Sequence, residues 1–228
     1  MKLLKRYFVN LSIVLYIALC PLQVFSVENN PKPDQELNRV IKNIKEKEKN
    51  LKTFTAKFRQ TRKTRLLREP LHSEGMIYFD SSGKLLMKVT SPSPLLILFK
   101  KNTLIIYYPE RSKAEKRYIG NTENIIKKYF GIGQTGEALK KQYEIKLSTN
   151  QESDGYYLDM LPQQNAVSKH IERIEVMVNP ETWLPERIFL MEVKGDQSVL
   201  WLQFDSINQP LPPGIFSIPL PDKSDDEK

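Results

Sequence analysis

The residues that could do chemistry in this chain are few and lie far apart. His72 and His170 are the only histidines, and neither has a second histidine at a metal-binding spacing. The sequence contains no HExxH, Gly-x-Ser-x-Gly or P-loop pattern. Glu172 and Glu175 follow His170, but alternation along a strand places them on opposite faces, as solvent-facing charges. We therefore expect no catalytic residues, no metal and no cofactor, although an exported hydrolase with an unrecognised site stays open.

A second candidate is a dense basic run, which could bind an acidic partner or phospholipid headgroups. The alternative is a solvated strand edge that resists sheet-to-sheet pairing. The residues assigned to partner docking are Lys57, Arg59, Arg62 and Lys63, and the run continues through Arg65 and Arg68.

Apolar residues form three runs in the middle of the chain, at 85–87, 95–99 and 104–108. Side chains of both parities are apolar in these runs, whereas a sheet with one buried face shows cleaner alternation. Such strands need cover on both faces. They predict either an ordinary two-sided core or a hydrophobic pocket inside a curled sheet.

The N-terminus has the pattern of a secretory signal peptide. Lys2, Lys5 and Arg6 precede an apolar stretch over residues 11–25, and Ser26 offers a cleavage position. The stretch is short for a membrane span, so an uncleaved anchor is the less favoured alternative. We expect a periplasmic protein without residues 1–26, a folded domain over 27–221, and a disordered charged tail over 222–228.

Cys20 is the only cysteine, and it lies inside the expected signal segment. Removal of residues 1–26 would leave a chain without disulfides or a thiol nucleophile. A lipidated Cys20 is the alternative, although Leu19 is bulky for such a site. The chain carries 35 basic and 27 acidic residues. This balance suits an acidic partner or an anionic membrane, and export argues against nucleic acid.

The periodicity predicts one mainly β (α+β) domain. Asp34 can cap an amphipathic helix over residues 34–51, and alternation begins at Phe54. A helix within 121–130 and a short one over 135–142 interrupt the strands. The short turns imply antiparallel hairpins, so we expect one large antiparallel sheet of about ten or eleven strands that curls on itself, with the helices as a cover. The strands are expected at 75–79, 84–90, 95–100, 103–108, 113–119, 143–148, 156–161, 171–178, 185–193 and 199–206, after the one at 54–59.

Four segments resemble the periplasmic outer-membrane lipoprotein carriers of the LolA family. Phe54-x-x-x-Phe58-x-Gln60 is similar to the first strand of that family, and Gly75-Met-Ile-Tyr78 to the second. The segment 104–109 is similar to its Tyr-x-Pro strand. Asn208-x-x-Leu211-Pro-x-x-x-Phe216 is similar to its closing segment. The order and spacing of these pieces carry the resemblance.

The resemblance implies an incomplete antiparallel β-barrel, or half-barrel, with helices as a lid. Its cavity would take the acyl chains of lipoproteins, and the protein would carry them from the inner to the outer membrane. The implied partners are acylated lipoproteins, an inner-membrane lipoprotein-releasing complex and an outer-membrane receptor, and the implied state is a monomer. The cavity residues expected on this basis are Phe58, Tyr78, Leu85, Met87, Ile97, Phe99, Ile106 and Tyr108, and the lid residues are Ile125, Ile126, Tyr129 and Phe130.

One departure from the family concerns the closed state of the lid. The family has a Lys-Arg-Pro after the second strand, whose arginine is thought to hold the lid closed, whereas residues 79–83 here contain no arginine. Ser81 or Ser82 would offer only one short donor, so we expect a lid that opens more easily. Arg59 and Lys88 are the next candidates for the latch.

The leading functional hypothesis is a periplasmic lipoprotein chaperone without enzymatic activity. The first alternative is a lipid-anchored outer-membrane receptor of similar fold, attached through Cys20. The second is an exported lipid-sensing or stress-sensing interaction module.

Overall fold

The computed structural model describes residues 33–120, 136–149, 155–163 and 168–218. The expected signal peptide with Cys20, the lid residues Ile125, Ile126, Tyr129 and Phe130, and the tail at 222–228 all lie outside the described residues. The expectations that concern them therefore stay predictions.

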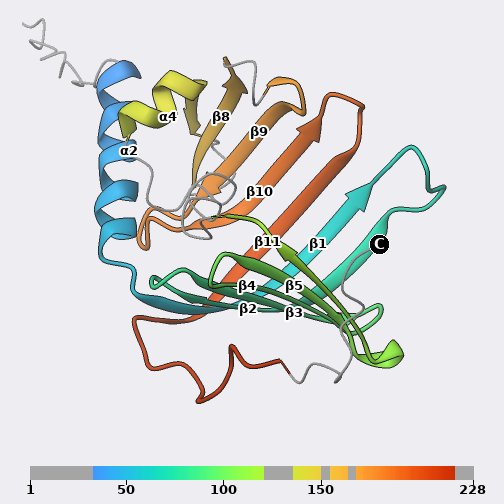
Figure 1. Cartoon of the computed structure of the whole chain (residues 1–228). Coiled ribbons are helices and arrows are strands. Elements are labelled where there is room, and N and C mark those ends of the chain that lie inside the picture. The colour runs from blue at the N-terminus through green and yellow to red at the C-terminus, as the bar shows by residue number, and fades with distance from the viewer. Residues whose placement is uncertain (1–32, 121–135, 150–154, 164–167, 219–228) are drawn as a thin grey trace, which may run out of the picture. The chain divides into compact units, whose positions relative to one another are not determined.

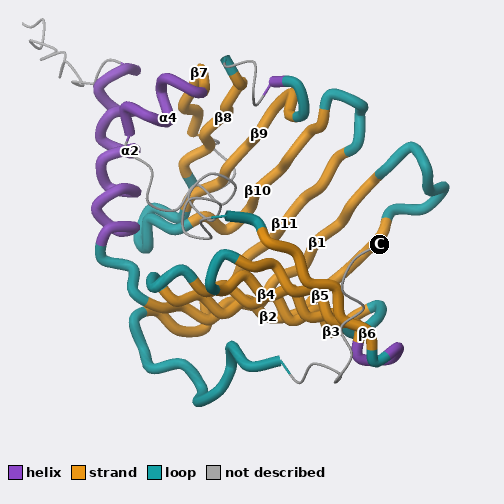
Figure 2. The backbone as a smooth tube through the Cα atoms, viewed as in Figure 1, coloured by secondary structure: helices purple, strands orange, loops and turns teal. Residues whose placement is uncertain are grey.

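The described residues form one eleven-stranded antiparallel sheet (Figures 1 and 2). Strands that follow each other in sequence pair as neighbours, with the exception of β6 and β7. Strand β1 also pairs with β11 and so joins the two halves of the chain. The sheet ends at β6 on one side and at β7 on the other, so it is open. The strands are β1 (Thr53–Lys63), β2 (Leu71–Asp80), β3 (Lys84–Ser91), β4 (Leu95–Lys100), β5 (Thr103–Tyr108), β6 (Lys113–Tyr118), β7 (Tyr143–Thr149), β8 (Tyr156–Pro162), β9 (Ile171–Val178), β10 (Pro185–Glu192) and β11 (Gln197–Ile207).

Helices α2 (Pro33–Lys49) and α4 (Gly136–Gln142) accompany the sheet, and a 3-10 turn, η1 (Pro109–Arg111), joins β5 to β6. The expected fold class, a mainly β incomplete barrel with an N-terminal amphipathic helix, is confirmed. The helices expected at 34–51 and 135–142 are α2 and α4. Strand β2 begins at Leu71, four residues earlier than expected, because its first residues pair with β1.

Helix α2 packs its apolar stripe on the end of the sheet formed by β7–β9. Leu37, Val40 and Ile41 are buried there against Tyr143 and side chains of β8 and β9. The η-nitrogen of Arg39 donates to the Tyr156 hydroxyl at 2.7 Å, and the guanidinium lies 5.7 Å from the centre of that ring. We call the face that α2 covers the inner face, and the other the outer face.

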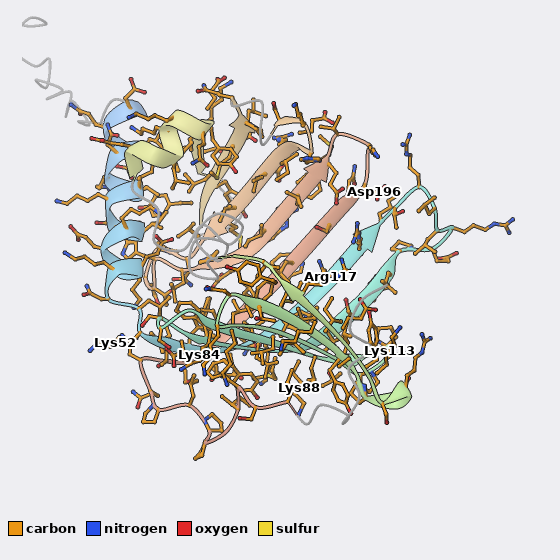
Figure 3. The ribbon with its side chains drawn as sticks, viewed as in Figure 1. Lys52, Lys84, Lys88, Lys113, Arg117 and Asp196 are labelled. Atoms are coloured by element: carbon orange, nitrogen blue, oxygen red, sulfur yellow. The ribbon has the colours of Figure 1, made fainter. Side chains whose placement is uncertain are left out.

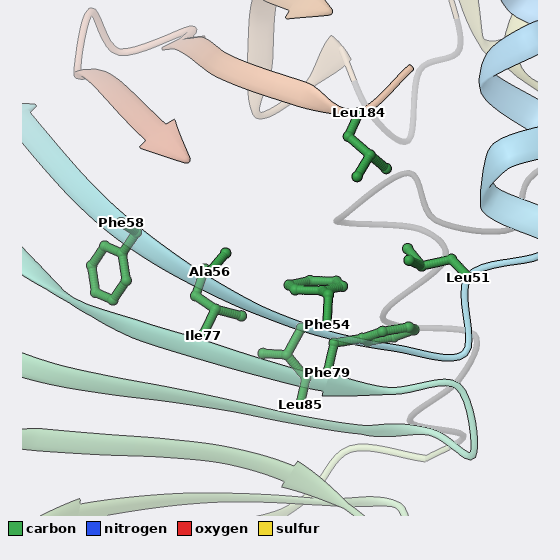
Figure 4. Packing of buried hydrophobic residues seen from close by; sticks show 8 residues of the cluster. All are labelled: Leu51, Phe54, Ala56, Phe58, Ile77, Phe79, Leu85 and Leu184. Carbon is green, nitrogen blue, oxygen red and sulfur yellow. The ribbon is translucent and has the colours of Figure 1, made fainter. Parts of the chain in front are cut away.

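The inner face of β1–β3 holds the central core of the protein. Its buried residues are Leu51, Phe54, Ala56, Phe58, Ile77, Phe79, Leu85 and Leu184 (Figure 4). The outer face of β3 and β4 is covered by the C-terminal segment, since Phe216 is buried with Leu86 and Leu98. The Lys100 ammonium donates to the Phe216 carbonyl at 3.0 Å and fixes that segment. The apolar runs of both parities therefore have cover on the outer face and an apolar inner face.

Asn208 ties the end of β11 to the start of β1. Its side-chain oxygen accepts the Lys52 N–H at 2.7 Å, and its side-chain nitrogen donates to the Asn50 carbonyl at 2.9 Å. Its own N–H donates to the Thr53 carbonyl at 2.8 Å. The backbone is left-handed, with φ 56°, a conformation that asparagine tolerates better than most residues. These bonds join α2 to the closing strand.

Replacing Asn208 should therefore destabilise the whole domain. Asn208→Ala removes both side-chain bonds at a left-handed position, and we expect a loss of about 2–3 kcal/mol in the free energy of unfolding. Asn208→Asp keeps the acceptor and loses only the donor, so about half that loss is expected. Urea denaturation measures both. Equal stability of the wild type and both variants would contradict the role of Asn208.

Candidate functional site

An apolar surface crosses the inner face from β11 to β5. Its middle row runs across six strands in continuous register, through Phe204, Ala56, Ile77, Met87, Ile97 and Ile106. Side chains on the same face of adjacent strands lie in contact distance, so the row is continuous. No charged residue interrupts it.

Seven of the eight residues expected in the cavity share this face. Phe58 and Leu85 are almost completely buried, at 2% and 1% exposure, and form the floor of the surface. The other five are half-buried and present apolar area toward the interior of the curled sheet; they are Met87, Ile97, Phe99, Ile106 and Tyr108.

Tyr78 is the exception. In the register it stands beside Leu86 of β3 and Thr55 of β1, one position away from the inner-facing Ile77 and Phe79. It packs with the outer-face cluster around Leu86, Leu98 and Phe216. Because side chains alternate along a strand, Tyr78 cannot face the same interior as Ile77. We therefore leave it out of the cavity.

The half of the inner face under α2 contains a cavity of about 120 Å³. Ile41 and Ile44 of α2 cover it, and Lys45 forms an ion pair with Glu48 at 2.7 Å among its lining residues. The floor consists of inner-facing side chains of β7–β10: Ile145, Leu158, Met160, Val176, Val178, Pro185 and Ile188. Ligand pockets usually measure about 300–1,000 Å³, so this space holds only part of a large apolar ligand.

The sequence predicts the strands of this half of the site, but none of the expected cavity residues lies on β7–β11. The signal was present in the alternation of Leu200, Leu202 and Phe204 along β11. What could not be read locally is that β11 pairs with β1 and so extends the apolar surface of β1–β5.

The four residues assigned to partner docking do not form one surface. Lys57, Arg59 and Lys63 lie on the outer face, where Lys57 pairs with Asp205 at 3.6 Å. Arg62 alternates to the other side and lies 3.5 Å from Glu192. The idea that this run protects a strand edge is wrong, because β1 lies between β2 and β11 in the sheet.

The turn that lacks the family's arginine is organised by Asp80. Its carboxylate accepts the Ser82 N–H at 2.7 Å and lies 3.3 Å from the Lys84 ammonium. Partial burial raises the pKa of Asp80, but the hydrogen bonds from Ser82 and Lys84 outweigh burial and hold the pKa below its ordinary value.

The two residues named as alternative latches have the wrong orientation. Arg59 and Lys88 are both exposed, and their register positions place them on the outer face; Lys88 is labelled in Figure 3. Neither side chain points into the interior that a lid would cover. The expectation that one of them holds a lid closed therefore has no support from their placement.

The chemistry that the inner face can perform is burial of apolar groups. The described residues contain no group of acidic residues, histidines or cysteines arranged to hold a metal ion. None of the helices in the described ranges is long and apolar enough to cross a bilayer. The geometry thus defines an open antiparallel sheet whose curled inner face offers apolar surface.

A family model described as outer membrane lipoprotein carrier protein LolA matches residues 49–219, and the chain belongs to the LolA family. A comparison with curated proteins found no match to the sequence.

Solved structures match the chain at low sequence identity. An uncharacterized conserved protein from Thermus thermophilus is 10% identical, with a TM-score of 0.52, and the match covers 82% of this chain and 97% of that one. A LolA superfamily protein from Nitrosomonas europaea is 16% identical, with a TM-score of 0.39, over 78% and 97% of the two chains. The Mycobacterium tuberculosis lipoprotein LppX is 10% identical, with a TM-score of 0.49, over 78% and 98%.

Proposed function

We propose that the protein is a periplasmic carrier that binds the acyl chains of lipoproteins on its inner face and moves them from the inner to the outer membrane. The observation that carries the proposal is the unbroken apolar row from Phe204 to Ile106, half-buried over most of its length. Membership of the LolA family supports the same reading. Binding, not catalysis, is its activity.

The free-energy cost of leaving an acyl chain in water is large. Each methylene of an acyl chain costs about 0.8 kcal/mol when it is left in water, so a chain of lipid length has to be covered during transfer. A surface that remains half-exposed without ligand meets this need, because the same side chains gain contacts when the acyl chain covers them. The 120 Å³ cavity under α2 would take one end of a chain.

Such a carrier would work in the periplasm, with one membrane partner that loads it and another that unloads it. Export would follow from residues 1–26, whose basic and apolar segments match a signal peptide. An inner-membrane lipoprotein-releasing complex would load the carrier, and an outer-membrane receptor would unload it. The carrier would work as a monomer.

The test is a titration of purified protein with a triacylated lipopeptide and with the same peptide lacking its acyl chains. We expect saturable binding of the acylated peptide with a negative heat-capacity change, because apolar surface is buried. We expect no binding of the deacylated peptide at the same concentration. Equal affinity for the two peptides would contradict the proposal, because recognition would then lie in the peptide.

A further inference from the structure

The loop between β1 and β2 displays apolar side chains to solvent. Leu66 is 93% exposed, Leu67 51% and Leu71 45%, and these are three of the six large apolar side chains exposed in the described part of the chain. We call residues 63–71 the β1–β2 tip. Strand β3 pairs with β2 only as far as Glu74, so the tip extends beyond it, as the cyan hairpin in Figure 1 shows.

A defined turn in the β1–β2 tip holds Leu66 and Leu67 exposed to solvent. The Thr64 hydroxyl accepts the Leu66 N–H at 3.0 Å, and the Thr64 carbonyl accepts the Leu67 N–H at 3.2 Å. Threonine commonly organises a turn in this way. The base of the turn is held by Asp196, labelled in Figure 3, whose carboxylate accepts the Arg65 N–H at 3.3 Å.

The charges of the β1–β2 tip are strongly unbalanced. Lys63, Arg65 and Arg68 surround the leucines, and Glu69 is the only acidic residue between positions 63 and 71. Among the described residues, none of these three cations has an acidic side chain within ion-pair distance, whereas Arg62 at the base pairs with Glu192. The tip therefore combines uncompensated positive charge with exposed apolar side chains.

We propose that the β1–β2 tip docks on an anionic phospholipid surface. Leu66 and Leu67 would insert at the boundary between headgroups and acyl chains, while Lys63, Arg65 and Arg68 contact lipid phosphates. This combination, apolar side chains bordered by lysine and arginine, is what interfacial membrane binding requires. The proposal concerns the surface of the protein and stands whether or not the inner face carries acyl chains.

A membrane suits the β1–β2 tip better than a protein partner does. Apolar anchors of protein interfaces lie within a flat, well-packed patch that excludes water. Leu66 instead stands at the end of a projecting hairpin, where little protein surface surrounds it. A bilayer can receive such a projection without a matching pocket, and its anionic headgroups complement the three cations.

The experiment is sedimentation of the whole protein with vesicles of phosphatidylethanolamine and phosphatidylglycerol, in comparison with pure phosphatidylcholine vesicles. We expect binding to the anionic vesicles and at least tenfold weaker binding to the neutral ones. The double variant Arg65→Gln/Arg68→Gln should weaken anionic binding about 25-fold, since each basic residue near such a surface contributes about fivefold. The variant Leu66→Ser/Leu67→Ser should weaken it at least tenfold.

The matched control is Tyr118→Ser. Tyr118 is also a large exposed side chain, at 80%, but the strand register places it at the opposite end of the sheet from the β1–β2 tip. This control should bind the anionic vesicles as the wild type does. A Leu66→Trp variant should show a blue shift of its added fluorescence on anionic vesicles, which reports insertion directly.

Three results would overturn the proposal. If the wild-type protein stays in the supernatant with anionic vesicles, the tip does not bind membranes and would instead contact a protein partner. Unchanged binding by Leu66→Ser/Leu67→Ser would show that charge alone is responsible. Equal loss of binding in the Tyr118→Ser control would show that the effect does not belong to the tip. All the substituted side chains are exposed, and thermal unfolding should show melting temperatures like that of the wild type.

Discussion

The double variant Ile97→Asp/Ile106→Asp should lose binding of the acylated lipopeptide by at least about 100-fold. Ile97 of β4 and Ile106 of β5 are cross-strand neighbours on the inner face, and both are half-buried. A carboxylate there either stays charged against the acyl chain or must take up a proton, and either outcome costs several kcal/mol. The fold should survive, because the residues lie near the edge of the sheet and outside the buried core.

The control for this prediction is Ile105→Asp. Ile105 is the neighbour of Ile106 on the same strand and is also half-buried, but it faces outward and packs with the cluster around Phe216. We expect it to reduce stability by about 1–2 kcal/mol and to keep lipopeptide affinity within about threefold of wild type. If Ile105→Asp abolished binding as completely as the double variant, the assignment of the inner face would be incorrect.

The substitution Gly75→Ala should destabilise the protein more than any surface change. A Cβ at this position would lie 2.0 Å from the Lys88 carbonyl oxygen and 2.9 Å from the Val89 Cα, both backbone atoms of β3. The strands cannot stay paired in their present register with that contact. We expect a loss of about 3 kcal/mol or more in the free energy of unfolding, which for a domain of this size lowers the melting temperature by about 10 °C.

Gly155→Ala provides the comparison for Gly75→Ala. The added Cβ would meet the Met177 side chain at 3.0 Å, and a methionine side chain can move aside. The expected change in stability is within about 1 kcal/mol. A melting temperature for Gly75→Ala as high as that of Gly155→Ala would show that β3 shifts at little cost, against the close approach in the structure.

The boundaries that the sequence predicts best are those set by local turn chemistry. Strands β4 and β5 and the turn between them appear where predicted, because two apolar runs are separated by Lys101-Asn102. Both of these turn residues have positive φ, at 49° and 63°, as a two-residue hairpin turn requires. The extension of β2 back to Leu71 was not predicted, because its first residues are held by pairing with β1.

The candidate site likewise contains positions that follow from the sequence and positions that do not. Alternation along β3–β5 places Leu85, Met87 and Ile97 on one face, so these positions follow from the sequence once the strands are known. The family motif alone suggests Tyr78 as a cavity residue, but alternation with Ile77 and Phe79 makes it face outward. The contribution of β7–β11 depends on the pairing of Ala56 with Phe204, which lie far apart in the sequence. Local patterns contain no information about such a pairing.

The most direct test of acyl-chain binding on the inner face is site-specific photo-cross-linking to an acylated lipopeptide. A photoreactive amino acid would replace one residue at a time on adjacent positions of the same strands. If the inner face binds acyl chains, we expect cross-links to the acyl chain from Ile97 and Ile106, and none from their outward-facing neighbours Leu96 and Ile105. Cross-links of equal yield from both sets of positions, or from the outward-facing set alone, would contradict acyl-chain binding on the inner face.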